Sequence, residues 1–313
     1  MGPSAATPHP PHPTARTGIL CALGGFTLWG LFPIYFKALA AVPAMEVLAH
    51  RIVGSVGLLA ILLSLTGGWS GWWLELNNWR KTGYYLATTL LIAGNWLVYI
   101  WAVQNGHVLG ASLGYYINPL VSVLLGVVFL REKLSRWQGL AVLLAAAGVS
   151  FLVFRQGSVP WISLVLAASF GSYGLLRKRA GVNPLLSLFL ETLLLSPFAL
   201  TWLIVLAVQG QGALGTVDMR TNLLLLSAGV ITVVPLMLFL ESMRHLRLAT
   251  VGLLQYLTPT LQFLLAVALY HEPFSATHLV TFSFIWIALG IYSADAFAQL
   301  RASTRDRSVE LPP

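Results

Sequence analysis

One segment of this chain occurs twice. Residues 110–136 return in similar form as residues 250–276. The two copies align Tyr116 with Tyr256, Pro119 with Pro259, Glu132 with Glu272 and Ser135 with Ser275. Internal repeats are common in membrane transporters, where the substrate site lies at the interface between the copies. The repetition therefore favours an architecture of two related halves.

The composition places these halves in a lipid bilayer. Hydrophobic residues make up 57% of the 313 residues and charged residues only 9%, which is too little charge for the surface of a soluble domain. The formal net charge is +8, but the basic residues are scattered between apolar runs and form no stripe that would bind nucleic acid. Cys21 is the single cysteine, so we expect no disulfide framework, no metal site and no cofactor.

Ten apolar segments are long enough to cross about 30 Å of hydrocarbon, which predicts an all-α integral membrane protein with ten transmembrane helices. They lie near residues 18–39, 44–66, 83–104, 108–130, 137–154, 159–176, 184–208, 222–242, 248–270 and 277–298. Residues 1–17 are rich in proline and residues 299–313 are polar, so both segments are predicted to be disordered tails. The first apolar run is longer than the apolar core of a signal peptide and ends without a cleavage motif, so we interpret it as a retained span.

Arginine and lysine predict the orientation of these spans. If the N-terminus is cytoplasmic, the inside segments carry most of the basic residues: Arg16, Arg80, Lys81, Arg131, Lys133, Arg136, Arg177, Lys178, Arg179, Arg244, Arg247, Arg301, Arg305 and Arg307. The outside loops then carry only Arg155 and Arg220. The positive-inside rule therefore predicts a multi-pass protein with both termini in the cytoplasm.

The two copies of the repeat lie five spans apart, so they must cross the membrane in opposite directions. This spacing predicts two inverted five-helix repeats, residues 18–154 and residues 159–298. The first parts of the halves agree more faintly, in FTLWG at residues 26–30 and FGSYG at residues 170–174. Inverted repeats around a central site are typical of carriers that work by alternating access.

Several segments across both halves are similar to the EamA family of the drug/metabolite transporter superfamily, and more narrowly to its RarD-type permeases. The resemblance is carried by VPAMEVLAHRIVGS (residues 42–55), AGNWLVYIWAVQNGHVLGASLGYYINPL (93–120), VFLREKLSRWQ (128–138), YGLLRK (173–178), RLATVGLLQYLTPTLQFLLAV (247–267) and TFSFIWIAL (281–289). It covers roughly residues 18–298. The resemblance implies two five-helix domains, a bacterial inner-membrane location and solute transport without ATP hydrolysis. The chain departs from smooth repeat symmetry where Asn95 aligns with Pro235.

Charged residues inside the spans are candidates for function, because a central Asp, Lys or Arg costs about 2.5 to 3.5 kcal/mol on insertion scales. Aligning Pro43 with Pro184 brings His50 opposite Glu191, with Arg51 next to it. One interpretation is that His50, Arg51 and Glu191 form a titratable or substrate-facing cluster in which Glu191 carries a proton. The other is a closed ion pair that holds the two halves together. We expect Glu46 and Lys37 to lie near the outer interface and to reach water.

Polar residues also recur at helical spacing on three spans, and we expect these faces to point inward. They are Thr88, Asn95 and Tyr99; Ser112, Tyr115, Asn118, Pro119 and Ser122; and Gln255, Tyr256, Thr258, Pro259 and Gln262. The prolines of the repeat also free backbone carbonyls near the middle of the membrane. These faces either line a solute cavity or bond the helices to one another. Gly106, Gly110 and Gly114 predict a close helix contact or, as the alternative, a dimer interface.

The sequence contains no H-E-x-x-H set and no phosphate-binding G-x-x-x-x-G-K-[ST] loop, so we expect neither an enzyme nor an ATP-driven pump. The prediction is a secondary transporter of a small amphipathic organic molecule, such as an amino acid, another metabolite or a drug. The alternative is an uncoupled channel, which saturation of flux and acceleration by preloaded solute would distinguish from a carrier. The expected partners are the solute and the lipid bilayer, with the protein as a monomer or a homodimer.

Overall fold

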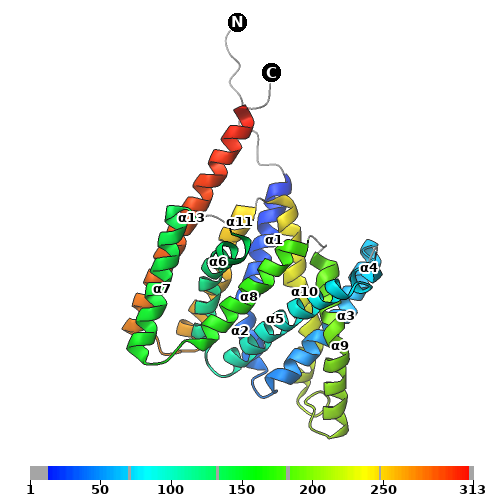
Figure 1. Cartoon of the computed structure of the whole chain (residues 1–313). Helices are drawn as coiled ribbons and strands as arrows, with labels where there is room; N and C mark the ends of the chain where they lie inside the picture. Colours follow the sequence, from blue (N-terminus) through cyan, green and yellow to red (C-terminus); the bar gives the residue numbers. More distant parts are fainter. Residues whose placement is uncertain (1–12, 70–71, 132–133, 181–183, 247, 310–313) are drawn as a thin grey trace.

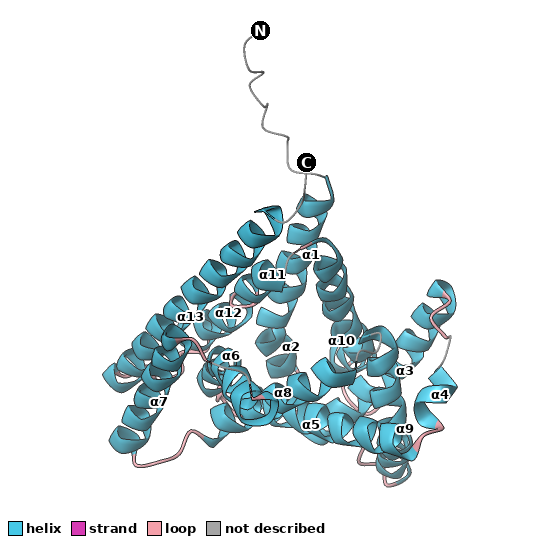
Figure 2. Ribbon diagram, turned by 45° about the horizontal axis from the view of Figure 1, so that its top comes forward, coloured by secondary structure: helices cyan, strands magenta, loops and turns pink. Residues whose placement is uncertain are grey.

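The computed structural model describes residues 13–69, 72–131, 134–180, 184–246 and 248–309, which form a bundle of helices (Figure 1). No strand occurs among these residues (Figure 2). The first half contains α1 (Pro13–Gly30), α2 (Phe32–Ala38), α3 (Ala44–Thr66), α4 (Trp72–Leu76), α5 (Trp79–Gln104), α6 (Val108–Leu130) and α7 (Arg136–Gln156). The second contains α8 (Trp161–Ala180), α9 (Pro184–Val208), α10 (Met219–His245), α11 (Leu248–Leu254), α12 (Leu257–Leu264), the π-helix η1 (Leu265–Leu269) and α13 (Ala276–Val309).

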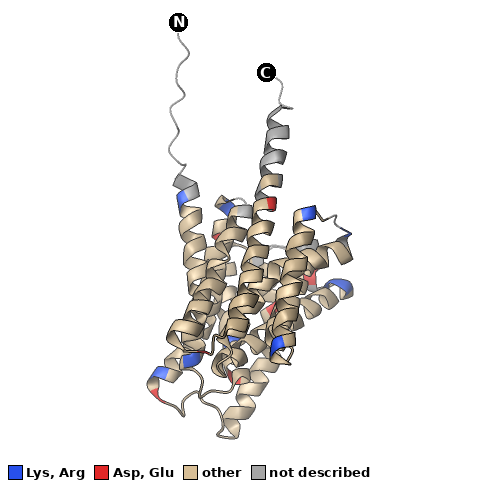
Figure 3. Cartoon of the chain, turned by 90° about the vertical axis from the view of Figure 1, so that its left-hand side faces the viewer, with Lys and Arg blue, Asp and Glu red and all other residues tan. Residues whose placement is uncertain are grey.

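Within the described residues, nine helical segments are long and apolar enough to cross a membrane. They correspond to nine of the ten predicted spans, and predicted bounds 44–66, 108–130 and 184–208 coincide with those of α3, α6 and α9. The remaining predicted span, 159–176, forms α8, of which Trp161–Arg177 is counted as a shorter apolar helix. Figure 3 shows Lys, Arg, Asp and Glu gathered mainly towards the two ends of the bundle.

The chain begins and ends differently from the prediction of two tails. Of the predicted tail 1–17, residues 1–12 lie outside the described part, while α1 already begins at Pro13. The prediction of a disordered tail over 299–313 differs from the structure, because α13 continues as a helix to Val309. No glycine or proline stands between Gly290 and Pro312 to stop it. The start of α1 and the end of α13 lie at the same end of the bundle (Figure 1).

Local signals set several helix ends. Ser135 forms a capping box at the start of α7, where its side chain accepts from the backbone N–H of Gln138 and the Gln138 side chain accepts from the backbone N–H of Ser135. Gly67 and Gly157 end α3 and α7 in the left-handed conformation, at φ 65° and 67°. Glycine adopts this conformation without the steric cost of a side chain.

The two copies of the repeated segment fold differently around their prolines. The helix α6 continues through Pro119. In the second copy α11 ends at Leu254 and α12 begins at Leu257, so Pro259 lies in the first turn of a new helix, where a missing N–H costs little. The repeated segment is therefore one helix in the first half and three short helices in the second.

The two halves interlock through equivalent contacts. The first helix, α1, packs against α10 and α12 of the second half, and α8 packs against α5 and α6 of the first (Figures 1 and 2). The helix α3 packs against both α9 and α10, and α7 pairs with α13. In each half the opening helix therefore contacts the third and fourth spans of the other half.

Glycines permit the closest of these contacts. At the crossing of α3 and α10, a Cβ on Gly229 would lie 2.5 Å from the carbonyl oxygen of Gly54. Between α6 and α8, a Cβ on Gly114 would lie 2.8 Å from the carbonyl oxygen of Ser163, whose hydroxyl donates to the carbonyl of Gly110 at 2.6 Å. Gly110 and Gly114 thus form the predicted helix contact, whereas Gly106 lies in the preceding turn with φ 77°.

Candidate functional site

Arg51 on α3 lies in an aromatic environment with only 5% of its surface exposed. Its Nε donates to Thr232 Oγ1 on α10 at 2.6 Å. The guanidinium carbon is 4.2 Å from the ring centroid of Trp96 on α5, and 5.6 and 5.8 Å from those of Phe32 and Phe36 on α2. A cation is attracted to the face of an aromatic ring, so these rings stabilise the buried charge.

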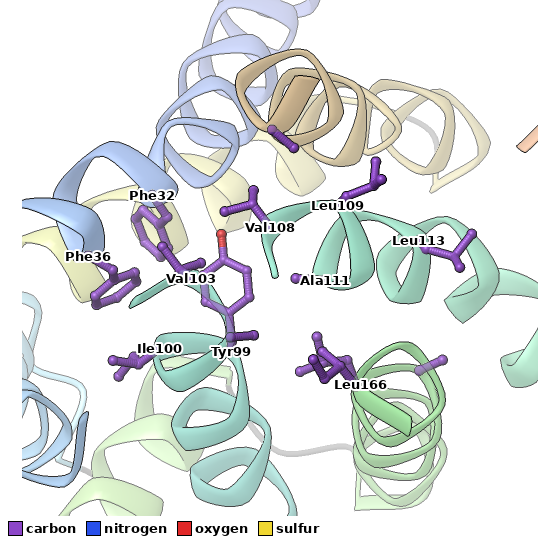
Figure 4. Packing of buried hydrophobic residues seen from close by; sticks show 14 of the residues in the cluster. Phe32, Phe36, Tyr99, Ile100, Val103, Val108, Leu109, Ala111, Leu113 and Leu166 are labelled. Atoms are coloured by element: carbon purple, nitrogen blue, oxygen red, sulfur yellow. The ribbon is translucent and has the colours of Figure 1, made fainter. Parts of the chain in front are cut away.

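Tyr99 extends this group of rings along α5. Its ring packs edge-to-face against Phe36 and Tyr115, with centroid distances of 5.9 and 5.6 Å. Its hydroxyl is buried and has no hydrogen-bond partner among the described residues. Figure 4 shows this hydroxyl directed between Phe32 and Val108. We call the set formed by Phe32, Phe36, Arg51, Trp96, Tyr99 and Thr232 the arginine cluster.

A second buried charge, Glu191 on α9, is held by direct polar contacts. Only 1% of its surface is exposed. Its Oε1 lies 3.3 Å from Nη1 of Arg177, and its Oε2 accepts a hydrogen bond from the Tyr173 hydroxyl at 3.0 Å. The Arg177 guanidinium also lies 5.4 Å from the centroid of the Tyr173 ring. This glutamate cluster, Tyr173, Arg177 and Glu191, joins α8 to α9.

The predicted grouping of His50, Arg51 and Glu191 is wrong in its pairing. Among the described residues Glu191 pairs with Arg177, and neither His50 nor Arg51 forms an ion pair with it. Arg51 is seven residues from the start of α3, and Glu191 is seven residues from the start of α9. Each is about 10 Å into its helix at 1.5 Å per residue, but the two helices start at opposite ends of the bundle. Arg51 and Glu191 therefore lie at equal distances from the starts of their helices but are counted from opposite ends of the bundle.

Glu46 and Lys37 do not reach outward as freely as expected. Glu46 is 1% exposed, and its Oε1 accepts from the backbone N–H of Ala213 at 2.6 Å, which fixes the loop before α10 onto α3. His50 Nε2 lies 3.9 Å from the same Glu46 oxygen and makes no hydrogen bond in the described structure. The ammonium of Lys37 lies 5.5 Å from the centroid of the Tyr270 ring. These contacts join helices to loops at one end of the bundle.

Part of the predicted polar lining bonds helices to one another. The Thr258 hydroxyl donates to the carbonyl of Phe26 at 3.0 Å, and Gln262 Nε2 donates to the carbonyl of Trp29 at 3.3 Å. Both carbonyls belong to the last turns of α1, and that of Trp29 has no N–H four residues further on, because residue 33 is a proline. Ser112 similarly donates to the carbonyl of Pro259 at 2.9 Å.

Two of the predicted lining residues, Asn118 and Gln262, keep buried polar atoms without a hydrogen bond among the described residues. Asn118 is buried, and its Oδ1 accepts no hydrogen bond among the described residues. Gln262 Oε1 is likewise buried without a donor. Gln255 and Tyr256 are half-buried at the break between α11 and α12. The polar faces therefore combine interhelical bonds with unsatisfied groups, as both interpretations of the sequence allowed.

Asn95 on α5 contacts α8, and its repeat counterpart Pro235 on α10 makes the equivalent contact with α1, but the two contacts differ in chemistry. Asn95 Nδ2 donates to the carbonyl of Leu166 at 3.0 Å and to Ser169 Oγ at 2.9 Å on α8, and its Oδ1 lies 3.4 Å from the Tyr115 hydroxyl. In the other half, Pro235 faces Gly25 on α1, where an added Cβ would lie 3.0 Å from the Pro235 carbonyl oxygen. A side-chain hydrogen bond on one side thus corresponds to close backbone packing on the other.

The groups that surround Arg51 and Glu191 were not predicted from the sequence. Trp96, Phe32 and Phe36 cover Arg51, while Tyr173 and Arg177 hold Glu191. For two pairs the sequence did contain a signal. Phe32 and Phe36 are four residues apart, as are Tyr173 and Arg177, and this spacing places each pair on one face of a helix. No pattern along the chain indicated Trp96 or Thr232.

Comparison with known proteins identifies the family. Residues 16–154 and 159–294 each match the model of the EamA-like transporter family. The first match ends near the end of α7 and the second begins just before α8, so the boundary between them is also the boundary between the interlocked halves. The family description therefore applies to each half of the chain.

Relatives extend over nearly the whole chain. An uncharacterized transporter of Vibrio cholerae serotype O1 is 47% identical over 298 residues, covering 95% of this chain and 99% of the relative. Protein RarD of Escherichia coli (strain K12) is 44% identical over 289 residues, covering 92% and 98%. A solved structure described as "Crystal structure of protein" shares the fold, with a TM-score of 0.55 at 19% identity over 88% of this chain and 96% of that one. The chain therefore belongs to the EamA-like transporter family and is a RarD-type membrane permease.

Proposed function

We propose that this protein is a secondary transporter that moves a small organic metabolite or drug-like solute across the bacterial inner membrane by alternating access. The observation that carries the proposal is the interlocking of the halves, in which α1 packs on α10 and α12 while α8 packs on α5 and α6. Because the two halves make equivalent contacts, the bundle can pack in two related ways around a central site. One packing would open the site to one side of the membrane and the other to the opposite side, which is the basis of alternating access.

The proposal includes ten membrane spans arranged as two inverted five-helix repeats, residues 18–154 and 159–298, with both termini in the cytoplasm. The position of α8 supports the tenth span, because α8 occupies the place in its half that α1 occupies in the other. The common end of α1 and α13 supports placing both termini on one side (Figure 1). Arginines and lysines near that end favour the cytoplasm.

The break between α11 and α12 supports a solute path beside Gln255 and Tyr256. Backbone groups freed within a membrane are tolerated where protein or a water-filled cavity covers them, and interrupted helices commonly mark transporter binding sites. Asn118 lies on α6, which packs against α12, and its Oδ1 has no donor. We assign these groups to the path and assign the bonded Thr258 to helix packing.

We also assign Glu191 to structure in preference to proton transfer. Its two carboxylate oxygens already face a guanidinium and a phenol donor within the glutamate cluster. A buried carboxylate with a charged partner is costly to neutralise, because protonation would leave that partner uncompensated. Transport is accordingly proposed without a proton requirement at Glu191.

The test begins by comparing metabolites inside and outside cells that overexpress or lack the protein. The solute that changes is then followed in proteoliposomes made with the purified protein. A carrier gives saturable flux that preloaded solute accelerates, whereas a channel gives flux that does neither. Absence of any protein-dependent flux of that solute would contradict the proposal.

Substitutions then test the path. We expect Asn118→Leu and Gln255→Leu to lower exchange at least about tenfold, because each removes a polar group that faces the solute. Gln209→Leu is the matched control, since Gln209 is exposed in the loop before α10. Wild-type exchange in both path variants, with normal membrane insertion, would return these residues to helix packing.

A further inference from the structure

We propose that the arginine cluster binds the carboxylate of an organic anion, with Arg51 as the partner of the negative charge and the surrounding rings in contact with the apolar body. This inference rests on the proposed transport function and names the substrate class. A site of this kind would select an anionic solute over neutral and cationic molecules of the same size.

Arg51 has no counter-charge among the described acidic side chains. Each acidic side chain that the structure describes has another partner: Glu46 with Ala213, Glu75 with Lys81, Glu191 with Arg177, Asp218 with Thr221, Glu241 with Arg244 and His245, Glu272 with Val108 and Leu109, and Asp295 with Ser135. The charge of Arg51 is therefore uncompensated within the described part of the chain. An ionisable residue in this situation inside a membrane protein marks a ligand or ion path.

The guanidinium of Arg51 is only partly hydrogen-bonded within the described residues. Its Nε is occupied by Thr232, a neutral hydroxyl that itself donates to the carbonyl of Ala228 at 2.8 Å. The rings of Trp96, Phe32 and Phe36 surround the guanidinium. The N–H groups on Nη1 and Nη2 make no hydrogen bond to any described residue. They form a planar fork, and a carboxylate fits such a fork through two parallel hydrogen bonds.

Tyr99 offers a second donor. The hydroxyl of Tyr99 is buried and makes no hydrogen bond to a described residue, and its ring packs against Phe36, which also contacts the Arg51 guanidinium. A phenol donates readily to a carboxylate oxygen, so Tyr99 and Arg51 supply donors of the same kind to one ligand. Tyr35 also packs against Phe36, with a centroid distance of 5.1 Å, but its hydroxyl already donates to the carbonyl of Leu224 at 2.7 Å.

The proposal commits to a carboxylate with an apolar body over a small inorganic anion. The cluster offers one guanidinium fork among aromatic side chains, which are contributed by α2 and α5. Ligand pockets of this kind use a few polar groups to orient a molecule whose remaining surface contacts apolar side chains. Inorganic phosphate would leave those side chains without a partner.

The test is ligand-induced stabilisation of the purified protein against thermal unfolding. The probes are a panel of aromatic and aliphatic monocarboxylates, each beside its uncharged carboxamide, and inorganic phosphate. At least one carboxylate should bind about tenfold to a hundredfold more tightly than its amide, since a charged hydrogen bond replaces a neutral one. Arg51→Gln should abolish that preference, and Arg51→Lys should weaken it, because lysine keeps the charge but loses the fork. Arg220→Gln, at an exposed arginine, should retain it.

Two outcomes would overturn the proposal. One is a panel in which every carboxylate behaves as its amide does, or in which phosphate stabilises as strongly as the organic acids. The other is a carboxylate preference that persists in Arg51→Gln. Saturable, preload-accelerated exchange of a neutral or cationic solute by Arg51→Gln would leave the transporter proposal standing while this inference fails. Carboxylate binding without any flux would support this inference while the transporter proposal fails.

Discussion

Arg51 and Glu191 are buried charged residues that each lie seven residues from the start of their helix, α3 or α9, but their surroundings differ. Glu191 has a guanidinium and a phenol within hydrogen-bonding distance of its carboxylate oxygens. Arg51 has one neutral hydroxyl and three rings, and no carboxylate among the described residues. The charge of Glu191 is therefore paired within the fold. The N–H groups on Nη1 and Nη2 of Arg51 have no acceptor among the described residues.

The two surroundings distinguish a charge that stabilises the fold from a charge that is available to a ligand. Burying a charge is costly unless it is paired and hydrogen-bonded. The glutamate cluster meets that condition and joins α8 to α9. The arginine cluster meets it only in part, and aromatic rings offset some of the cost. A residue that costs stability at a central site is a candidate for ligand binding, because natural sequences accept such costs where function requires them.

Removing the satisfied charge should have the largest effect. We expect Glu191→Gln to destabilise the protein by about 3 kcal/mol, because the Arg177 side chain, only 19% exposed, loses its anion. Thermal unfolding of the purified variant measures this. The matched control is Glu241→Gln, at a carboxylate whose side chain is 41% exposed, and it should stay within about 0.5 kcal/mol of wild type. Equal stability of the two variants would remove the structural role of Glu191.

Removing the unsatisfied charge should have a smaller effect of opposite sign. We expect Arg51→Met to raise stability by about 1 kcal/mol, since the cost of a buried lone cation exceeds the cation–π attraction that is lost. The same thermal measurement applies, with Arg220→Met as the exposed control. A destabilisation as large as that of Glu191→Gln would mean that Arg51 has a structural counter-charge.

An exposed carboxylate extends the comparison to the surface and should give the smallest effect. Hydrogen bonds from the Thr221 hydroxyl and backbone N–H to Asp218, the N-cap of α10, lower the pKa of that carboxyl below its ordinary value. Because the folded pKa is depressed, the carboxylate stabilises the folded state above its unfolded pKa. This contribution is lost as pH falls through the folded value.

Wild type should therefore be slightly more stable than Asp218→Asn at neutral pH, and the difference should shrink below about pH 4 and disappear once the pH is below the folded pKa. Thermal unfolding of both proteins as a function of pH is the measurement. A difference that stays constant down to acid pH would show that the charge of Asp218 does not contribute.

The spans themselves were predictable from the sequence. Residues 44–66 and 184–208 are apolar over a length that crosses a bilayer, apart from a few charged residues such as Arg51 and Glu191, and both are helices with those bounds. Hydropathy acts locally along the chain, so it identifies a membrane helix without knowledge of its neighbours. The family resemblance was visible for the same reason, because its motifs are continuous segments.

The partners of the buried charges were not predictable. An alignment of inverted repeats gives the position of Arg51 relative to the start of α3 and that of Glu191 relative to the start of α9, and these starts lie at opposite ends of the bundle. The contacts of Arg51 with Trp96 and Thr232 come from α5 and α10 and depend on how helices cross. No spacing along one helix contains that information.

The break after Leu254 was also beyond the repeat pattern. The copies share a proline, yet only the second divides into α11 and α12. Thr258 and Gln262 bond to carbonyls at the end of α1, whereas the first copy is packed tightly on α8 at Gly114. Tertiary contacts thus separate two similar sequences. Glu132, the repeat counterpart of Glu272, lies outside the described residues.

The most direct test of the contrast is to measure exchange per folded molecule for Arg51→Met and Glu191→Gln in the same proteoliposome preparation, using the solute found by metabolite comparison. We predict that Arg51→Met is folded and has lost exchange at least about tenfold, because the anion has no partner. Glu191→Gln should be less stable but should keep exchange near that of wild type in its folded fraction. Wild-type exchange by Arg51→Met, together with loss of exchange by folded Glu191→Gln, would contradict the division between a binding charge and a structural one.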